Sequence, residues 1–317
     1  MPVIALDLGG TKLASALFTD DGAIIHNVQI PIVGKKGKEV GSIILEKAYE
    51  LLNKSIEEGL NVQGIGISVP GIAYSKTGRV WAPNIPEWED YPLFDELRSA
   101  IGNKIAIRIE SDRSCYILGE LWKGNARGCS DAIFLAIGTG IGAGILSGGR
   151  VLHGAGDIAG AVGWLALNRH FEEKYVQCGC FEYHASGAGI TKVAEELSQN
   201  QKGTGESERI WNTQKVFDAF DRGDKLAIDV VGNAIEYWGM AVANLVSIFN
   251  PEKIIFGGGV FGPALRFLDR IYAEATKWAQ PISIRQVKLE GSALVNNAGL
   301  YGAGYLALEK TGLTDNV

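Results

Sequence analysis

The chain has 317 residues, of which 46% are hydrophobic and 21% charged, with a formal net charge of −6. This length exceeds one small core and favours two domains or one large α/β domain. An acidic chain without a Lys/Arg tract does not suit a nucleic-acid partner, and the lack of an apolar run of about 18 residues argues against a membrane span. No basic segment precedes the first apolar run and cysteines are few, so we expect a cytoplasmic protein without a signal peptide.

The first thirty residues predict a β-meander. Apolar runs cover Val3–Leu8, Leu13–Phe18 and Ala23–Ile30, and they are separated by Gly9-Gly10-Thr11 and Asp20-Asp21-Gly22. Gly and Asp at these breaks are typical turn residues, so the three runs read as consecutive hairpin strands.

Helix and strand patterns alternate in the next ninety residues. Apolar spacing predicts a helix over Gly41–Glu58, and apolar runs predict strands over Val62–Val69 and Ile105–Ile109. Glu110-Ser111-Asp112 follows the second of these strands, and Arg113–Lys123 has helical spacing. The strand therefore leads directly to an acidic residue at the start of a helix.

The opening pattern returns in the middle of the chain. Strands are predicted over Asp131–Ile137, Gly142–Leu146 and Arg150–His153, with Gly-rich turns at 138–140 and 147–149. Two copies of strand, Gly/Thr turn, strand, Gly turn and strand indicate a duplicated architecture.

The C-terminal half is predicted to be mainly helical, with one short strand and one polar surface loop. The helices are expected over Thr191–Gln199, Thr213–Gly223, Leu226–Ile248 and about Gly302–Lys310, the strand over Ile254–Phe256, and the loop over Ser198–Arg209.

Three glycine-rich turns each follow a predicted strand. Consecutive backbone N–H groups in such turns form anion nests, and glycine lets the backbone approach a polyphosphate closely. Any one of them is explained by a tight turn, but together they favour a nucleotide site, where Asp7 is placed to hold Mg²⁺ through water. The turns are Gly9-Gly10-Thr11, Gly138-Thr139-Gly140 and Gly257-Gly258-Gly259.

Asp112 is the candidate catalytic residue. A phosphoryl-transfer enzyme needs one carboxylate to accept the proton of the attacking hydroxyl and to align its oxygen. Asp is also a favoured N-cap for a following helix. The residues alone leave both roles open.

Seven motifs, in order along nearly the whole chain, resemble the ROK family of sugar kinases and sugar-responsive repressors in the actin/hexokinase/Hsp70 superfamily. They are DLGGT at 7–11, GIGISVPG at 64–71, APNIPEW at 82–88, ESDRSCYILGE at 110–120, IGTGIGAGI at 137–145, GCFEYHASG at 179–187 and IIFGGGV at 254–260.

The resemblance implies two ribonuclease H-like, actin-like ATPase domains with a central cleft. We expect the first over residues 1–115, with a C-terminal helix at about 301–317 packing back onto it, and the second over 116–300. The implied activity is ATP-dependent phosphorylation of a hexose or amino sugar at its 6-hydroxyl, with Mg²⁺, in a protein that forms a homodimer. A catalytically weakened sugar-binding or regulatory protein is the alternative.

The resemblance also assigns site residues. Asp112 is the base, and Asp7 holds Mg²⁺ through water. The remaining residues are Gly9, Gly10, Thr11, Lys12, Gly138, Thr139 and Gly140 for the phosphates, Gly257, Gly258 and Gly259 for adenosine, and Gly71, Asn84, Ser111, Asp112 and Glu182 for the sugar.

The sequence departs from the family pattern where relatives read G-E-x-G-H. Ala161 stands for the Glu and Trp164 for the His, and neither side chain can bind zinc. Ser111 also replaces the usual Asn. We therefore do not expect the family's zinc site, and we expect either an altered preference at C1, C2 or C3 of the sugar or weakened catalysis. The weak candidates for a substitute zinc site are His170, Cys178, Cys180 and His184, which otherwise read as reduced thiols and surface or packed histidines.

Three further patterns have other readings. Residues 138–143 satisfy G-x-G-x-x-A, but a dinucleotide fingerprint needs a helix next and these residues lead into a strand. ROK repressors carry a helix-turn-helix before the phosphate loop, for which a loop starting at residue 7 leaves no room. Trp81 and Trp88 flank Asn84 and are candidate pocket walls, whereas 237–240 is expected to be core.

Overall fold

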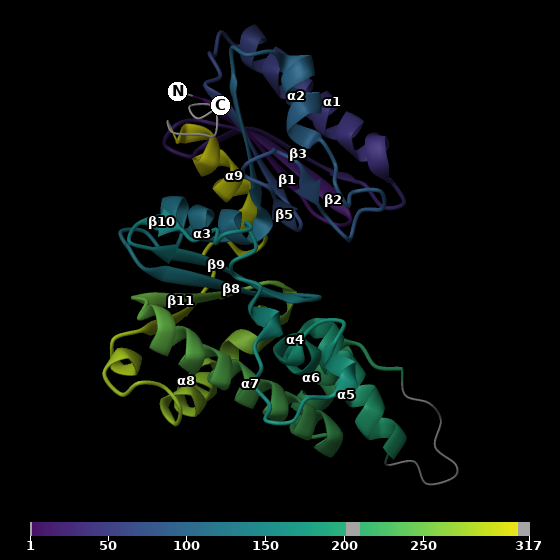
Figure 1. The fold of residues 1–317 in the computed structure, drawn as a ribbon, viewed down its shortest axis with the longest axis vertical. Coiled ribbons are helices and arrows are strands. Elements are labelled where there is room, and N and C mark those ends of the chain that lie inside the picture. Colours follow the sequence, from purple (N-terminus) through teal and green to yellow (C-terminus); the bar gives the residue numbers. More distant parts are fainter. Residues whose placement is uncertain (1, 201–209, 310–317) are drawn as a thin grey trace. The chain divides into compact units, whose positions relative to one another are not determined.

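A computed structural model of the chain describes residues 2–200 and 210–309. This part of the chain contains two mixed sheets with helices packed against them (Figure 1). No helix in it combines the length and the apolar character that a membrane span requires.

The chain divides into two compact units. The N-terminal unit comprises Met1–Gly128, Val151–Ala159 and Ala293–Val317, and the C-terminal unit comprises Cys129–Arg150 and Gly160–Ser292. The backbone therefore passes from one unit to the other four times. This grouping differs from the expected division at residue 115, because the whole helix that follows residue 111 packs within the N-terminal unit.

The sheet of the N-terminal unit has the strand order β3-β2-β1-β4-β7. Its first three strands form the predicted meander: β1 (Val3–Leu8), β2 (Lys12–Phe18) and β3 (Ile24–Pro31) pair antiparallel. β4 (Gly64–Val69) then pairs parallel with β1, and β7 (Ala106–Ser111) pairs parallel with β4. The carboxyl ends of β1, β4 and β7 therefore lie at one edge of this sheet.

The sheet of the C-terminal unit repeats this order as β10-β9-β8-β11-β12. β8 (Ala132–Ile137), β9 (Ile141–Ser147) and β10 (Arg150–Val151) form the second meander, and β11 (Lys253–Gly257) and β12 (Lys288–Gly291) add parallel strands. The two sheets thus have the same topology, and the predicted duplication is confirmed.

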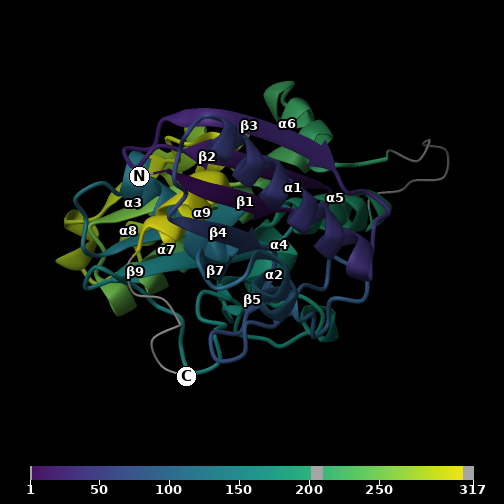
Figure 2. The same ribbon diagram turned by 90° about the horizontal axis from the view of Figure 1, so that it is seen from above.

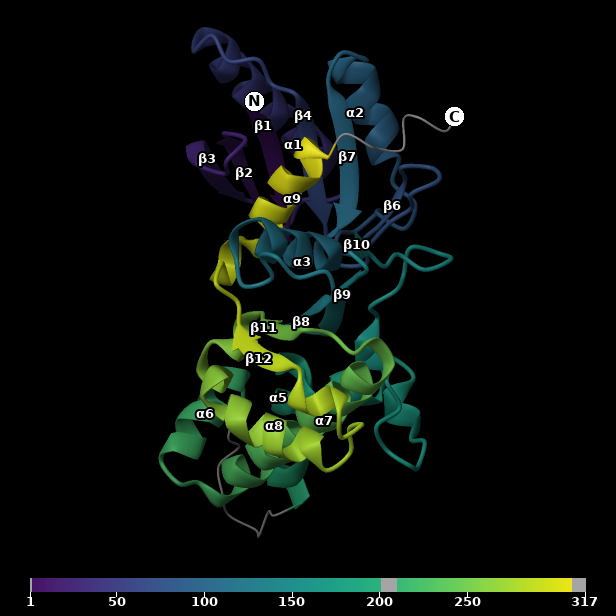
Figure 3. The ribbon, with the colours of Figure 1, turned by 90° about the vertical axis from the view of Figure 1, so that its left-hand side faces the viewer.

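Alternation along β1 assigns the two faces of the N-terminal sheet. Ile4, Leu6 and Leu8 belong to the core that includes the apolar side of α1 (Gly37–Glu57), whereas Val3 and Ala5 pack with α9 (Ala298–Leu308). The two helices therefore cover opposite faces of the sheet, as Figures 2 and 3 show. By this alternation Asp7 is on the α9 side.

Two more helices complete this unit. α3 (Asp112–Lys123) begins where β7 ends and packs lengthwise against α9, and α2 (Leu93–Ile101) contacts α1 and β7. The short hairpin β5 (Ile72–Ala73) and β6 (Val80–Trp81) follows β4.

The segment after β6 places one expected pocket residue in the core. Trp88 is fully buried, stacks on Tyr91 at 4.3 Å between ring centroids, and donates from Nε1 to the carbonyl of Gly37 at 3.0 Å. The prediction that Trp88 lines a pocket is therefore wrong, because its indole fills the space between this segment and α1. Trp81 is 37% exposed.

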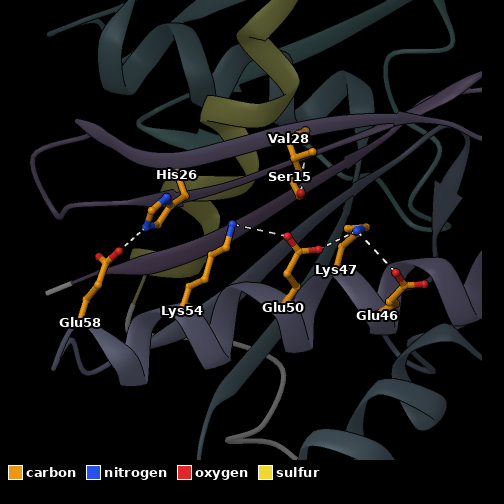
Figure 4. Close-up of polar contacts among 8 residues, drawn as sticks. All are labelled: Ser15, His26, Val28, Glu46, Lys47, Glu50, Lys54 and Glu58. Carbon is orange, nitrogen blue, oxygen red and sulfur yellow. Dashed lines mark hydrogen bonds and ion pairs between the residues drawn. The ribbon is translucent and has the colours of Figure 1, made fainter.

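A row of charged side chains follows the edge of α1 that faces β3 (Figure 4). His26 on β3 pairs with Glu58 just beyond the helix, and Lys47 pairs with Glu50 at 2.6 Å. Ion pairs at the protein surface each contribute between 0 and about 1 kcal/mol, so apolar packing is the larger source of stability for α1.

The helices of the C-terminal unit share one apolar core with β8 and β11. Trp238 is fully buried there and donates from Nε1 to the carbonyl of Ala185 at 3.0 Å, which confirms the expectation that 237–240 is core. The helices are α4 (Cys180–Ala185), α5 (Gly187–Asn200), α6 (Thr213–Asp221), α7 (Lys225–Phe249) and α8 (Leu268–Thr276).

Several boundaries differ from those predicted. α1 starts one turn before Gly41, and the strand predicted over Arg150–His153 ends at Val151. Of the predicted loop, Ser198–Asn200 belong to α5, and 201–209 lie outside the described residues. The final helix runs from Ala298 to Leu308, and position 310 lies outside the described residues. Among the described residues, the sequence did not predict the helices α2, α4 and α8 or the strands β5, β6 and β12.

Candidate active site

Asp112 is the first residue of α3, directly after the last residue of β7. Ser111 holds the N-cap position, so Asp112 is not the N-cap that one reading of the sequence allowed. Its Oδ1 accepts the backbone N–H of Arg113 at 2.8 Å, and its Oδ2 accepts the hydroxyl of Tyr116 at 3.2 Å. These two bonds fix the orientation of the carboxylate at the carboxyl end of the sheet.

The electrostatic surroundings make Asp112 a better base than an exposed Asp. Burial raises the pKa of Asp112 to about 6, and the nearby Asp7 carboxylate adds to the rise, while the Arg113 guanidinium opposes it. A carboxyl group with this pKa is ionised at neutral pH yet binds a proton more readily than a model Asp.

Asp7 lies at the end of β1 beneath the start of α9. A Cβ atom placed on Gly299 of α9 would be 2.6 Å from both carboxylate oxygens of Asp7, so only glycine fits there. Burial raises the pKa of Asp7, and the Ser68 hydroxyl and the Lys12 ammonium partly offset the rise. Asp7 and Asp112 therefore form a pair of neighbouring carboxylates in one unit.

This pair fits the magnesium ion that nucleotide chemistry implies. Ser68 is the register partner of Asp7 on β4, and its buried hydroxyl is close enough to the Asp7 carboxylate to lower the pKa of Asp7. Two neighbouring carboxylates suit a hydrated Mg²⁺, which binds through one or two carboxylates and keeps most of its water.

The first glycine-rich turn is tight, and its tip is exposed. The N–H of Gly9 donates to the carbonyl of Lys12 at 2.9 Å, while Gly10 and Thr11 are exposed. Asn84 lies beside the turn, because a Cβ on Gly10 would be 3.7 Å from the Cβ of Asn84. The structure thus brings the first turn and one expected sugar residue together.

Arg113 links the two other sugar-site candidates of this unit. Its Nε donates to Oγ of Ser111 at 3.2 Å, and its Nη2 donates to the carbonyl of Gly71 at 3.4 Å. Ser111 itself is buried. Sequence reasoning missed both Arg113 and Tyr116. The spacing of four residues between Asp112 and Tyr116 on a helix is the one local signal that points to the second of them.

In the C-terminal unit, Glu182 on α4 supports the second glycine-rich turn. Its Oε2 accepts the N–H of Ile141 at 2.6 Å, and burial raises the pKa of its carboxyl group. The carbonyl of Gly138 accepts the N–H of Gly187 at the start of α5 at 2.8 Å, while Thr139 at the tip is exposed. The carboxylate of Glu182 thus braces the turn, and its expected role in the sugar pocket stays a prediction.

The third glycine-rich turn lies beside the second. Gly258 has φ of +89°, and a Cβ there would be 2.5 Å from the carbonyl oxygen of Ile137. The site of a Cβ on Gly138 is 4.0 Å from the nitrogen of Gly259. The turns at 138–140 and 257–259 therefore form one glycine-lined surface within this unit.

The four candidate zinc ligands do not form a metal site. His184 stacks on Tyr237 at 4.3 Å between centroids and bonds through Nε2 to the hydroxyl of Tyr175 at 2.9 Å. Cys178 bonds to the carbonyl of Gly179, and His170 is exposed. Within 2–200 and 210–309, no three His, Cys, Asp or Glu side chains are grouped so as to hold a metal. The substitute zinc site built from His170, Cys178, Cys180 and His184 is therefore not supported.

The sequence model of the ROK family matches residues 3–310. The chain belongs to the ROK family. The mixed sheets and their order agree with the actin-like ATPase fold of ROK kinases, so the predicted fold class is confirmed.

Curated ROK proteins of two kinds resemble the chain over almost its whole length. It is 31% identical to a glucokinase from Halalkalibacterium halodurans (97% of this chain, 95% of the relative) and 28% identical to an N-acetyl-D-glucosamine kinase from Haemophilus influenzae (96% and 99%). It is also 28% identical to a xylose repressor from Caldicellulosiruptor bescii, covering 95% of this chain and 76% of the repressor.

Among solved structures, the chain resembles a ROK family glucokinase from Streptomyces griseus in complex with glucose and AMPPNP. The TM-score is 0.74 and the identity 26%, and the match covers 96% of this chain and 99% of that one.

At the position where ROK relatives have G-E-x-G-H, this member has an apolar surface. Trp164 closes a 3-10 turn over Val162–Trp164 and is 57% exposed, and Ala161 is partly exposed. Gly163 between them is buried against the Glu182 side chain, with 3.0 Å between its Cβ site and Oε2. The backbone of this turn is thus held by the same residue that braces the second glycine-rich turn.

Proposed function

We propose that this ROK protein is an ATP-dependent sugar kinase that phosphorylates a hexose or an amino sugar, with the 6-hydroxyl as acceptor and Asp112 as the base. The observation that carries the proposal is the Asp112 carboxylate, held by two hydrogen bonds at the carboxyl end of β7 with a pKa near 6. The similarity to glucokinases and N-acetyl-D-glucosamine kinases supports the substrate class.

In the proposed reaction Asp112 accepts the proton of the sugar hydroxyl. The sugar oxygen then bonds to the γ-phosphorus, the bond between this phosphorus and the β–γ bridging oxygen breaks, and ADP leaves. Tyr116 and the N–H of Arg113 keep the carboxylate in one orientation, so the base needs no reorganisation during the step. Arg113 also holds Ser111 and Gly71, two of the proposed sugar-contacting positions.

The glycine-rich turns would hold the nucleotide. When bound, MgATP supplies the phosphoryl group and the cation that neutralises its developing charge. Gly10 and Thr11 in one unit and Thr139 in the other expose the chain atoms that suit phosphate oxygens, and Asp7 would hold the cation through water. Gly258 and Gly259 would contact adenosine.

The identity of the preferred sugar depends on the residues at positions 161 and 164. Ala161 and Trp164 offer no carboxylate or imidazole to a sugar hydroxyl, and each lost hydrogen bond of this kind costs about 0.5–1.5 kcal/mol. We therefore expect a sugar modified at C1, C2 or C3, such as an N-acetylhexosamine, to be phosphorylated more efficiently than unmodified glucose.

A coupled assay of ADP release over a panel of hexoses and N-acetylhexosamines tests both statements. Asp112→Asn is expected to lower kcat at least about a hundredfold, since a positioned general base contributes 10² to 10⁴, while KM for ATP stays within about twofold because the nucleotide contacts are retained. Asp229→Asn, on the exposed face of α7, is the matched control and keeps wild-type turnover. A clear preference for glucose would contradict the substrate proposal.

The alternative is a sugar-binding regulator with weakened catalysis. The 28% identity to a xylose repressor and the loss of polar groups at Ala161 and Trp164 favour it. Sugar binding by calorimetry, together with no sugar-dependent ADP release from any member of the panel, would replace the kinase proposal by this one.

A further inference from the structure

The segment Val151–Ala159 belongs to the N-terminal unit, although the residues before and after it in the sequence belong to the C-terminal unit. It leaves the C-terminal unit after Arg150, packs within the N-terminal unit, and returns at Gly160. We call these nine residues the strap. Two of its side chains form hydrogen bonds to the rest of the N-terminal unit. The partner residues are close in sequence to the proposed sugar and base residues.

The first bond joins His153 to the residue that precedes Ser111 and Asp112. His153 Nε2 pairs with Oε2 of Glu110 at 2.6 Å, and Oε1 of the same carboxylate accepts the N–H of Ser111 at 2.7 Å. The Glu110 side chain is 13% exposed and that of His153 is 42% exposed. Both oxygens of Glu110 are therefore engaged, one by the strap and one by the backbone that leads into the base.

The second bond holds the far end of the strap. Oδ2 of Asp157 accepts both the N–H of Ser75 at 3.0 Å and its hydroxyl at 3.1 Å, just after β5. Asp157 has φ of +58°, a conformation that Asp tolerates better than most residues. The strap is therefore anchored at two points, at His153 and four residues later at Asp157.

His153 is surrounded mainly by acidic groups. Glu110, Asp157 and Glu309 all face it, and Arg108 faces Glu309. The hydrogen bond to Glu110 is the largest influence and raises the pKa of His153. The ion pair is therefore fully formed below pH about 6.5 and is lost as the pH rises through the higher, folded-state value.

We propose that His153 is a positioning residue of the kinase reaction: through Glu110 it fixes the backbone at Ser111, and thereby the direction in which Asp112 presents its carboxylate to the sugar. The inference rests on the proposed function and adds a residue from the strap to it. His153 touches neither sugar nor nucleotide in this scheme, so its loss should lower kcat and leave KM for ATP nearly unchanged.

Kinetics of single and double variants test the route through Glu110. His153→Ala is expected to lower kcat about tenfold, because small misplacements of reacting groups cost rates of this order or more. Glu110→Gln should act similarly, and the double variant should lose no more than the larger single effect, since residues that act through one another are not additive. Losses that multiply would overturn the route.

The N-terminal unit offers a matched control. His26 on β3 also pairs with a glutamate, Glu58, just beyond α1, away from the residues proposed for the site (Figure 4). His26→Ala should leave kcat unchanged while removing the same kind of pair. His153→Gln, which keeps a neutral donor, should recover part of the lost rate. Equal losses of kcat in His153→Ala and His26→Ala would reduce the effect to general destabilisation.

The pH profile separates positioning from a purely structural role. Wild-type kcat should fall by about threefold above the pKa of His153, because a charge-assisted hydrogen bond is roughly twice as strong as a neutral one. His153→Gln should lack this alkaline limb while keeping the acid limb of Asp112. An unchanged alkaline limb in His153→Gln would contradict the proposal.

An NMR titration gives a test that needs no turnover. In wild-type protein the amide resonance of Ser111 should titrate with the same midpoint as the His153 ring, and Glu110→Gln should lower that midpoint. If the chemical shift of the Ser111 amide does not change over the pH range in which His153 titrates, the inference is wrong, even if the protein is an active kinase. If the coupling is present but no sugar is phosphorylated, the kinase proposal fails and the contact to the Ser111 backbone stands.

Discussion

At the residue scale, Asp112 combines two opposing demands. A base that works near neutral pH needs a raised pKa, and burial together with Asp7 raises the pKa of Asp112 to about 6. The same burial makes the ionised form costly in the folded state. Catalytic residues often carry such a cost, which the rest of the fold offsets.

Asp112→Asn should therefore stabilise the protein at pH 7. The folded-state pKa lies above the unfolded value, so the native state is favoured by protonation, and stability is lost as the pH rises from about 4 to about 6. The neutral amide removes this loss, and we expect a gain of about 1–3 kcal/mol in the free energy of unfolding at pH 7. Urea unfolding at pH 7 and at pH 4 measures it. A difference in the free energy of unfolding between variant and wild type that is the same at pH 4 and pH 7 would contradict the raised pKa.

His184 should make the free energy of unfolding depend on pH in the opposite direction to Asp112. Burial among aromatic rings lowers the pKa of His184 to about 4, so the native state keeps it neutral while the unfolded chain binds a proton below pH about 6.5. Stability contributed by this group is lost as the pH falls from 6.5 towards 4. His184→Phe, which can retain the stacking on Tyr237, should make the free energy of unfolding less dependent on pH by at most about 1.4 kcal/mol per pH unit.

At the scale of elements, the contact between α3 and α9 holds the carboxylate pair in place. A Cβ on Gly302 of α9 would be 1.8 Å from the carbonyl oxygen of Cys115, and one on Gly119 of α3 would be 2.2 Å from that of Ala298. Backbone thus meets backbone between the helix that begins with Asp112 and the helix that covers Asp7.

Gly302→Ala and Gly232→Ala should change stability in opposite directions. The added methyl group at 302 forces the two helices apart, and we expect a loss of about 2 kcal/mol or more. Gly232 is inside α7, and apart from the adjoining helix backbone no atom lies within 4 Å of its Cβ site, so alanine there should stabilise by about 0.5–1 kcal/mol. Chemical denaturation of the two variants checks this. Because 302 supports the carboxylate pair, only Gly302→Ala should also lower kcat.

At the scale of the whole molecule, the two units repeat one sheet topology but carry different parts of the proposed chemistry. The N-terminal unit contains the carboxylates of Asp7 and Asp112, and the C-terminal unit contains the turns at 138–140 and 257–259. Both units present an exposed turn tip after their first strand. We expect both tips to contribute to nucleotide binding.

Alanine at Gly10 and at Gly138 tests this expectation. Neither glycine has positive φ, and the Cβ sites have neighbours no closer than 3.7 and 4.0 Å, so both variants should fold normally. AMPPNP with Mg²⁺ at a hundred times its Kd should stabilise the wild type by about 2.7 kcal/mol. Each substitution should reduce the thermal shift at the same concentration, and a variant with an undiminished shift would remove its turn from the nucleotide site.

The homodimer expected from the family resemblance stays a prediction. Sedimentation equilibrium over a range of protein concentrations measures it, and a mass that remains near 34.0 kDa throughout would contradict it.

The amino-acid sequence by itself determined the two meanders, the strands over 62–69 and 254–256, and the duplicated order, because apolar runs and turn residues are local signals. It also singled out Asp7, Asp112 and the glycine-rich turns. The shortest elements, β5, β6, β12 and α4, escaped prediction because two to six residues carry too little periodicity, and α2 and α8 escaped it as well.

Only the tertiary structure decided which side chains support the candidate site. Arg113 reaches Gly71 over 42 residues, His153 reaches Glu110 over 43, and Asp157 reaches Ser75 over 82. No periodicity or spacing encodes such pairs, because each joins segments that are distant in sequence and meet only in the folded chain. For the same reason, only the tertiary structure shows that the strap belongs to the N-terminal unit and that Trp88 is in the core.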